Sequence, residues 1–336
     1  MTLKLSVLDH THISEGRTAK DALDEAVKLA QATEALGFGR YWVSEHHGTP
    51  SLASSSPEIL IAHLAANTNR IRVGSGGVML PHYSAYKVAE NFRLLEALHP
   101  GRIDAGLGRA PGGMPIATRA LQEGKYLEID EYPQQVEDLV GYLHDALPPE
   151  HRFARLRAAP QIQTAPEVWL LGSSDGSAAI AAAQGTAYAF AHFFGTGYDA
   201  KAVMDIYFSR FRPSAHNEKP RALAAVLVVC AETDEEANRL ATSGDLFFTS
   251  LYKGHDLPHL PSVSTAADYP YTEYDLQMIR QMRSNRFIGS PERVKQQLLE
   301  LGERLGVDEL MVVSPIHGFE ERVHSYRLLS EAFGLA

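Results

Sequence analysis

The chain alternates short apolar segments with longer amphipathic ones, and this alternation repeats eight times along its 336 residues. The short segments are rich in β-branched and aromatic residues, which favour strands, and the longer ones repeat apolar residues at helical spacing. Strands are expected at 3–9, 40–45, 70–77, 102–109, 167–174, 186–194, 221–233 and 307–315. Helices are expected at 19–37, 56–69, 85–99, 132–147, 175–185, 198–211, 234–244 and 319–334. Strand–helix units with short connections predict an α/β fold, a closed (β/α)8 TIM barrel rather than an open doubly wound sheet.

One segment breaks the alternation. Between the seventh and eighth strands, residues at about 244–286 mix aromatic, proline and polar side chains without a regular period. Long irregular insertions in compact domains often act as lids, so we expect a lid here, followed by an extra helix at 289–306. No low-complexity linker divides the chain, and residues 1–336 are therefore expected to form a single domain.

Charge and composition exclude several classes of function. The net charge of −10 argues against a nucleic-acid partner and against a basic membrane-binding patch. The sequence has neither an apolar stretch of about 18 residues nor the apolar run of a signal peptide, so a cytoplasmic protein without a membrane partner is expected. The single cysteine, Cys230, rules out an internal disulfide framework and a metal site with several thiolates.

Chemistry-bearing residues gather where the expected strands end, the positions that form the active site of a barrel. The second strand ends in Glu45, His46 and His47; the third in Ser75, Gly76 and Gly77; the fourth in Arg109; the fifth in Gly172, Ser173 and Ser174; and the sixth in His192. Small hydroxyl residues at a helix start, together with an arginine, predict a phosphate site. Adjacent glycines at a strand end let a flat ring system approach the backbone closely.

A metal site is the alternative for the histidines. His46 and His47 are consecutive, so on an extended backbone they point in opposite directions and do not face one ion together. A second histidine pair, in HTH at 10–12, lies near the first strand. A metal-dependent barrel hydrolase also needs converging carboxylates, which the strand ends hardly offer.

The same residues resemble the luciferase-like flavin-dependent monooxygenase family, most closely an uncharacterised bacterial branch of it. The resemblance runs from the first strand to the last helix and is strongest over 36–112. Its motifs occur in the family's order: EHH at 45–47, VG-x-GG-V-x-LP at 73–81, L-x-x-LHPGRID-x-G-x-GR at 95–109 and GSS at 172–174.

The resemblance implies a barrel that uses reduced FMN and O2 to oxygenate a small organic substrate, with the reduced FMN supplied by a separate reductase. It places His46 beside the flavin as the catalytic residue, and Arg109, Ser173, Ser174 and Ser177 around the FMN phosphate. The Gly76–Gly77 peptide, often cis in this family, would lie under the flavin ring. Glu45, His47 and His192 would line the substrate pocket or anchor its turn.

Two departures limit the resemblance. Gly108 stands where light-emitting members carry a reactive cysteine, and the loop at 110–122 is not that of the luciferases. A deazaflavin-dependent oxidoreductase and a non-catalytic flavin-binding protein are the alternatives that the motifs leave open.

A homodimer through the second and third helices is also expected. The helix at 56–69 has almost no polar face over Ile59–Ala66, and a helix that packs by one stripe would leave the rest as an exposed apolar patch. The resemblance points to the same surface.

Overall fold

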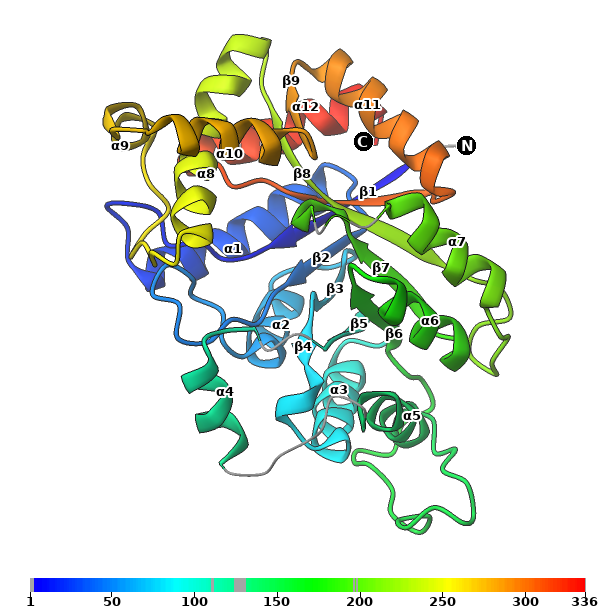
Figure 1. Ribbon diagram of the computed structural model, residues 1–336. Helices are drawn as coiled ribbons and strands as arrows, with labels where there is room; N and C mark the ends of the chain where they lie inside the picture. Colours follow the sequence, from blue (N-terminus) through cyan, green and yellow to red (C-terminus); the bar gives the residue numbers. More distant parts are fainter. Residues whose placement is uncertain (1–2, 110–111, 124–130, 196, 198, 336) are drawn as a thin grey trace.

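The computed structural model describes residues 3–109, 112–123, 131–195, 197 and 199–335. Within these ranges eight parallel strands close into a barrel surrounded by helices (Figure 1), because β10 pairs with both β8 and β1. The barrel strands are β1 (Lys4–Asp9), β2 (Arg40–Val43), β3 (Arg72–Ser75), β5 (Ile103–Gly108), β6 (Glu167–Gly172), β7 (Ala187–Ala191), β8 (Ala222–Cys230) and β10 (Glu309–Val313). The predicted TIM barrel is confirmed.

Two short strands extend the sheet outside this ring. β4 (Val78–Met79) pairs with the end of β5, and β9 (Arg286–Gly289) pairs with the end of β8. All nine residues of β8 are buried, as expected for a strand covered on both faces.

Apart from the helix that begins at Asp234, which continues to Tyr252 instead of ending at Gly244, the helices that cover the barrel follow the predicted ranges closely. They are α1 (Ala19–Ala35), α2 (Pro57–Ala66), α3 (Ala85–Leu98), α5 (Tyr132–Leu143), α6 (Asp175–Gln184), α7 (Ala200–Arg210), α8 (Asp234–Tyr252), α11 (Pro291–Leu305) and α12 (Phe319–Phe333). α4 (Pro115–Gln122) follows β5, and the short 3-10 helices η1 (Leu80–His82) and η3 (His192–Phe194) follow β4 and β7. No helix in the described ranges is both long enough and apolar enough to cross a membrane.

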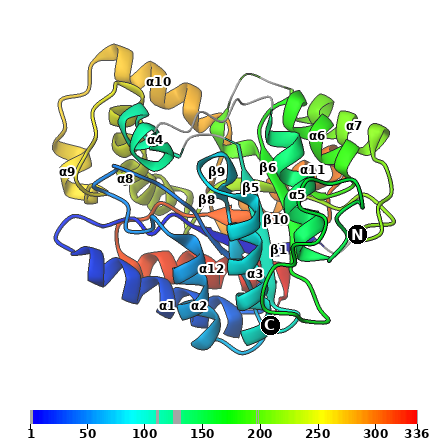
Figure 2. The ribbon, with the colours of Figure 1, turned by 90° about the horizontal axis from the view of Figure 1, so that it is seen from below.

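The insertion between β8 and β10 is more regular than predicted. Residues 244–252 complete α8, and α9 (Val263–Asp268), α10 (Glu273–Arg283) and β9 follow, so the expectation of an irregular segment is wrong for most of its length. Gly244 lies inside α8 and does not end the helix. It packs closely against Pro315, since a Cβ atom at this position would lie 3.1 Å from the proline ring. Seen from below, α8–α10 lie on the same side of the barrel as α4 (Figure 2).

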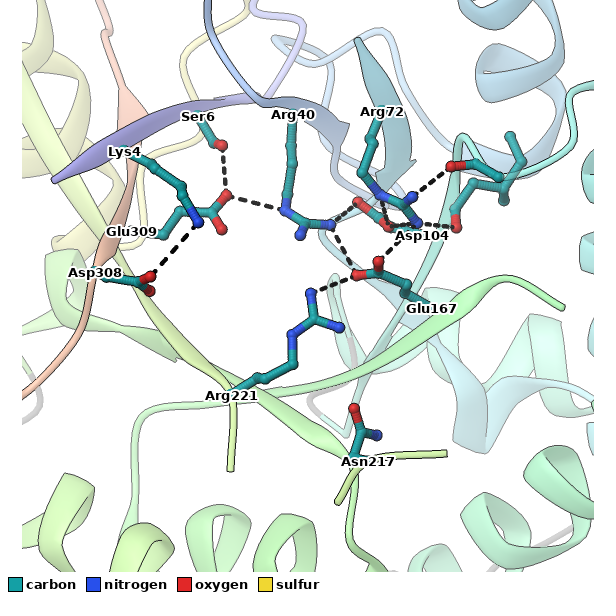
Figure 3. Close-up of polar contacts among 12 residues, drawn as sticks. Lys4, Ser6, Arg40, Arg72, Asp104, Glu167, Asn217, Arg221, Asp308 and Glu309 are labelled. Carbon is teal, nitrogen blue, oxygen red and sulfur yellow. Dashed lines mark hydrogen bonds and ion pairs between the residues drawn. The ribbon is translucent and has the colours of Figure 1, made fainter. Parts of the chain in front are cut away.

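The barrel interior changes character along its axis. At the amino ends of the strands, Arg40 donates to Asp104, Glu167 and Glu309 at 2.8, 3.2 and 2.9 Å (Figure 3). Arg72 also donates to Asp104, and Arg221 donates to Glu167. This charged base is defined by Arg40, Arg72, Asp104, Glu167, Arg221 and Glu309.

Above the charged base lies an apolar layer that includes the two tryptophans of the chain. Trp42 and Trp169 pack edge to face, with their ring centroids 5.6 Å apart. They are surrounded by Leu8, Ala187, Ala189, Leu223, Ala225, Met311 and Val313. Because these layers fill the lower barrel, the space left for a ligand inside the barrel lies toward the carboxyl ends of the strands.

Candidate functional site

A cavity of about 480 Å³ opens at the carboxyl ends of the strands. Its volume falls in the range of small-molecule and cofactor sites. The walls are mostly apolar and include Leu8, Trp42, Met79, Leu171, Phe193, Phe194, Leu223 and Met311. The polar groups are few and come from the ends of β1, β2, β5 and β6: His10, Ser44, Glu45, His46, Arg109, Ser173, Ser174 and Ser177. The arrangement is that of a site that shields a largely apolar ligand and fixes it at a few polar points.

One end of the cavity combines a cation with a helix N-terminus. Arg109 follows β5 and, within the described part of the chain, forms no ion pair. α6 begins with Ser174 as N-cap, and Ser173, Ser174 and Ser177 line the same cavity as Arg109. The first N–H groups of a helix have no partner within the helix, and the helix dipole favours an anion there. An unpaired guanidinium next to a helix N-terminus suits a phosphate group.

Ser177 shapes this end from below. Its hydroxyl donates to the Ser174 carbonyl at 2.7 Å and lies 3.0 Å from the Tyr188 hydroxyl. A Cβ atom at Gly172 would lie 2.1 Å from the Ser177 Oγ, so only glycine fits there. Gly172 and Ser177 therefore set the turn between β6 and α6.

The Gly76–Gly77 peptide forms a side-chain-free wall of the cavity, and it is cis, as predicted. A Cβ atom at Gly76 would lie 2.6 Å from the Leu8 Cδ1, and one at Gly77 would lie 2.8 Å from the Gly106 carbonyl oxygen. The packing beneath the peptide thus excludes any side chain, and its backbone is available to a flat ligand.

His46 faces the cavity from the end of β2, and His10 does so from the end of β1. The Ser44 hydroxyl lies between them, 3.1 Å from the His46 Nδ1 and 2.9 Å from the His10 Nδ1. Burial, the nearby His10 and His47 lower the pKa of His46 to about 3. His46 is therefore a neutral imidazole near pH 7, able to accept or donate one hydrogen bond toward a ligand.

Glu45 holds the turn that presents His46. Its carboxylate is 1% exposed and accepts hydrogen bonds from the Met79 amide at 2.9 Å and the Tyr83 hydroxyl at 2.8 Å. The His47 Nε2 lies 2.7 Å from the same carboxylate. Glu45 borders the cavity, whereas His47 lies behind it as part of this anchor.

Three of the predicted site residues do not line the cavity. Ser75 is fully buried, and its hydroxyl donates to the Gly106 carbonyl and accepts from the Gly106 amide, so it joins β3 to β5. His192 packs against Phe190 and Phe287 on the outer side of β7. His47 is the third, because it turns toward Glu45.

Two residues with polar side chains that line the cavity were not predicted, His10 and Ser44. His10 directly follows a strand, so the rule that found His46 applies to it as well. Ser44 also directly follows a strand, β2, but a serine at that position does not by itself indicate a role, since its role depends on a contact between neighbouring strands. Among the described residues, no group of three histidine, cysteine or carboxylate side chains is placed to hold a metal ion.

The cavity thus places a guanidinium group, a side-chain-free glycine backbone and a neutral buried imidazole at one mouth of a TIM barrel. The sequence profile of the luciferase-like monooxygenase family matches residues 3–309, and the chain belongs to that family. It is thus an oxidoreductase of the flavin-dependent monooxygenase class.

Individual relatives match over almost the whole chain. YwcH of Bacillus subtilis (strain 168) is 52% identical, over 98% of this chain and 99% of YwcH. The N-acetyl-S-alkylcysteine monooxygenase of the same strain is 38% identical, over 98% of both chains. The crystal structure of apo-MsnO8 has a TM-score of 0.89 at 39% identity and covers 99% of both chains.

More remote structures share the fold. The FMN complex of the oxygenating constituent of 3,6-diketocamphane monooxygenase from Pseudomonas putida has a TM-score of 0.71 at 20% identity, covering 98% of this chain and 97% of that one. An F420-dependent secondary alcohol dehydrogenase, bound to an F420-acetone adduct, has a TM-score of 0.69 at 12% identity and covers 99% of both chains.

Proposed function

We propose that this enzyme oxygenates a small organic substrate with reduced FMN and O2, and that a separate flavin reductase supplies the reduced FMN. The observation that carries the proposal is that Arg109, which forms no ion pair with any described residue, lines the same cavity as the start of α6 and His46. The diketocamphane enzyme, an oxygenating constituent whose structure contains FMN, supports both the cofactor and the separate reductase.

The residues fit FMN part by part. Arg109, Ser173, Ser174 and the first N–H groups of α6 would hold the phosphate. The bare Gly76–Gly77 backbone and the apolar walls would hold the ring system. When bound, reduced FMN supplies the reaction with O2, and the protein supplies position, electrostatics and exclusion of water. His46 would hold or move a proton at its Nε2, the nitrogen that Ser44 does not contact.

The first substrates to test are N-acetyl-S-alkylcysteines, because the relative that is 38% identical is named for them. The apolar wall formed by Met79, Phe193 and Phe194 suits the alkyl part of such a thioether. A deazaflavin coenzyme is the second candidate cofactor, and the F420-dependent dehydrogenase with the same fold favours including it in the titrations.

Arg109→Ala is expected to weaken FMN binding by about 1.5–3 kcal/mol, roughly 10- to 150-fold, since it removes a charged hydrogen-bond donor to the phosphate. Isothermal titration calorimetry with FMN and with riboflavin measures the effect. Riboflavin lacks the phosphate, so its affinity should be the same in the variant and in the wild type.

The control for this prediction is Arg210→Ala, which removes an exposed arginine at the end of α7. It should leave both affinities unchanged. Equal FMN affinity for Arg109→Ala and wild type would contradict the phosphate assignment and, with it, the carrying observation of the proposed function.

We propose that residues 253–262, with α9, act as the lid expected for the insertion. The loop joins the β1–α1 connection through Glu15, whose carboxylate accepts from the Ser262 amide and the Thr265 hydroxyl. Phe247, which precedes the loop, is buried and packs on His12. α8 would therefore stay in place while the loop moves. Limited proteolysis should cut within 253–262 first, and reduced FMN should slow the cut several-fold. Identical cutting with and without the flavin would mark a static insertion.

We also propose a homodimer through α2 and α3, although its basis in α2 is narrower than predicted. Leu60, Ile61 and Leu64 are buried in this chain's own core, and Ile59 remains 75% exposed. α3 adds Leu94 and Leu98, which are 54% and 59% exposed, and the three side chains are the apolar patch available for a partner. Ile59→Asp with Leu98→Asp should convert a dimer at micromolar concentration to a monomer in analytical ultracentrifugation. Leu299→Asp on α11 is the control, and a monomeric wild type would refute the interface.

A further inference from the structure

A hydrogen-bonded chain joins two histidines across the cavity wall. β1 and β2 are paired in register, Asp9 beside Val43, so the residues that follow each strand lie next to one another. The order of contacts is His46 Nδ1, Ser44 Oγ and His10 Nδ1, with distances of 3.1 and 2.9 Å. The two imidazole rings are nearly perpendicular, with centroids 5.5 Å apart.

The Ser44 hydroxyl restricts the protons on these nitrogens. A hydroxyl group donates one hydrogen bond and accepts others, so with both contacts made at least one of the two Nδ1 atoms must carry a proton. In the arrangement in which the His46 Nδ1 donates to Ser44 and the Ser44 hydroxyl donates to the His10 Nδ1, the neutral His46 keeps a free lone pair at its Nε2. The tautomers of the two histidines are therefore coupled through a single serine.

We propose that His46, Ser44 and His10 form a proton relay, in which His10 holds the proton that His46 takes from the cavity. This inference rests on the proposed function for its chemistry. A proton bound at the His46 Nε2 releases the Nδ1 proton to the Ser44 Oγ, and the Ser44 hydroxyl proton passes to the His10 Nδ1. One proton enters at the cavity, one is held at His10, Ser44 remains neutral, and the reverse sequence returns the proton.

The surroundings make any charge at His10 short-lived. Burial and the neighbouring His12 disfavour the imidazolium and lower the pKa of His10 to about 3, although the nearby Asp9 opposes that shift. Burial also lowers the pKa of His12 to about 3, and neither of its ring nitrogens has a hydrogen-bond partner among the described residues.

The remaining charged groups around the relay are held in other contacts. Asp9 accepts from the Tyr41 hydroxyl and pairs with Arg322, and Glu45 is held by Tyr83 and His47. Arg109 lies on the wall formed by the end of β5. The resting relay is therefore neutral, and a proton is held only while the cavity supplies one.

The tautomers provide a test that needs no flavin. Protein labelled with ring-15N histidine should show one Nδ1 of the pair protonated and the other not, assigned with His10→Gln and His46→Gln. Ser44→Ala should shift the Nδ1 signals of both histidines, and Ser44→Thr, which keeps a hydroxyl, should restore them. Ser54→Ala is the matched control, because Ser54 is a buried serine beside the same turn whose hydroxyl has no hydrogen-bond partner among the described residues. Unchanged Nδ1 signals in Ser44→Ala would overturn the inference.

A kinetic measurement separates the relay from a static link. The rate at which O2 oxidises reduced FMN bound to the enzyme is followed in mixtures of H2O and D2O. Wild type and Ser44→Thr should show a curved dependence on the deuterium fraction, as more than one proton moves, and Ser44→Ala a linear one. A linear dependence in wild type would refute the relay. If wild type fails to bind FMN in calorimetry, the proposed function fails, while the NMR test of the coupled histidines still decides the link between them.

Discussion

Replacing His46 with alanine is expected to slow substrate oxygenation by about 10²–10⁴-fold, the range for a positioned acid–base group. FMN affinity should change much less than in Arg109→Ala, because Arg109 and the start of α6, rather than His46, would hold the phosphate. The assay supplies reduced FMN, O2 and an N-acetyl-S-alkylcysteine, and measures product together with hydrogen peroxide. Loss of the acid–base group at position 46 would also explain a loss of coupling, in which O2 is consumed and hydrogen peroxide replaces product.

His192→Ala is the matched control for this variant. His192 also follows a barrel strand and has an unpaired Nδ1 among the described residues, but it lies off the cavity. Its replacement should leave turnover near the wild-type value. If His46→Ala retains both wild-type turnover and coupling, then His46 is a wall residue of the cavity and not its acid–base group.

Arg40→Met is expected to lower the free energy of unfolding by about 3–5 kcal/mol, the usual effect of removing one partner from a buried ion pair. Burial opposes the charge of Arg40, yet Asp104, Glu309 and Glu167 outweigh that cost and raise its pKa. Without the guanidinium, Glu309 loses its only ion-pair partner in the described chain, and Asp104 keeps Arg72. Urea unfolding followed by circular dichroism measures the change.

Arg221→Met provides the comparison within the same network. Its side chain is 44% exposed and pairs only with Glu167 in the described chain, so a loss of at most about 1 kcal/mol is expected. Equal losses for the two variants would show that burial does not set the energetics of the charged base. Because the charged base lies at the opposite end of the barrel from the cavity, FMN affinity should be unchanged in both.

The sequence was sufficient for the barrel and for most of the cavity, for one physical reason. Strand–helix alternation defines the barrel, and a barrel brings the carboxyl ends of its strands to one mouth. His46, Arg109 and the Gly76–Gly77 pair are placed there by their positions in the strands alone. The fold alone therefore predicted that these residues, which are far apart in the chain, lie close together.

Contacts between neighbouring strands could not be predicted in this way. Ser75 and Ser44 both end a strand, but a parallel strand buried on both faces lacks the polar–apolar alternation that would show which way each points. Ser75 turns to the backbone of β5, whereas Ser44 lies between two histidines. The helix that begins at residue 234 was wrongly predicted to end at Gly244 for a related reason. A glycine often ends a helix, but this one permits close packing on Pro315.

The position of the two tryptophans makes them an internal optical probe. Trp42 borders the cavity, and its indole N–H donates to Asp104 of the charged base at 2.9 Å. Trp169 packs against Trp42, and the guanidinium carbons of Arg40 and Arg221 lie 4.9 and 5.3 Å from the centroid of its ring. The tryptophan fluorescence of this protein therefore comes from a single pair of side chains, which contacts both the cavity and the charged base. Flavin absorbs where indole emits, so cofactor binding would quench this emission by energy transfer, whereas loosening of the charged base would shift its wavelength.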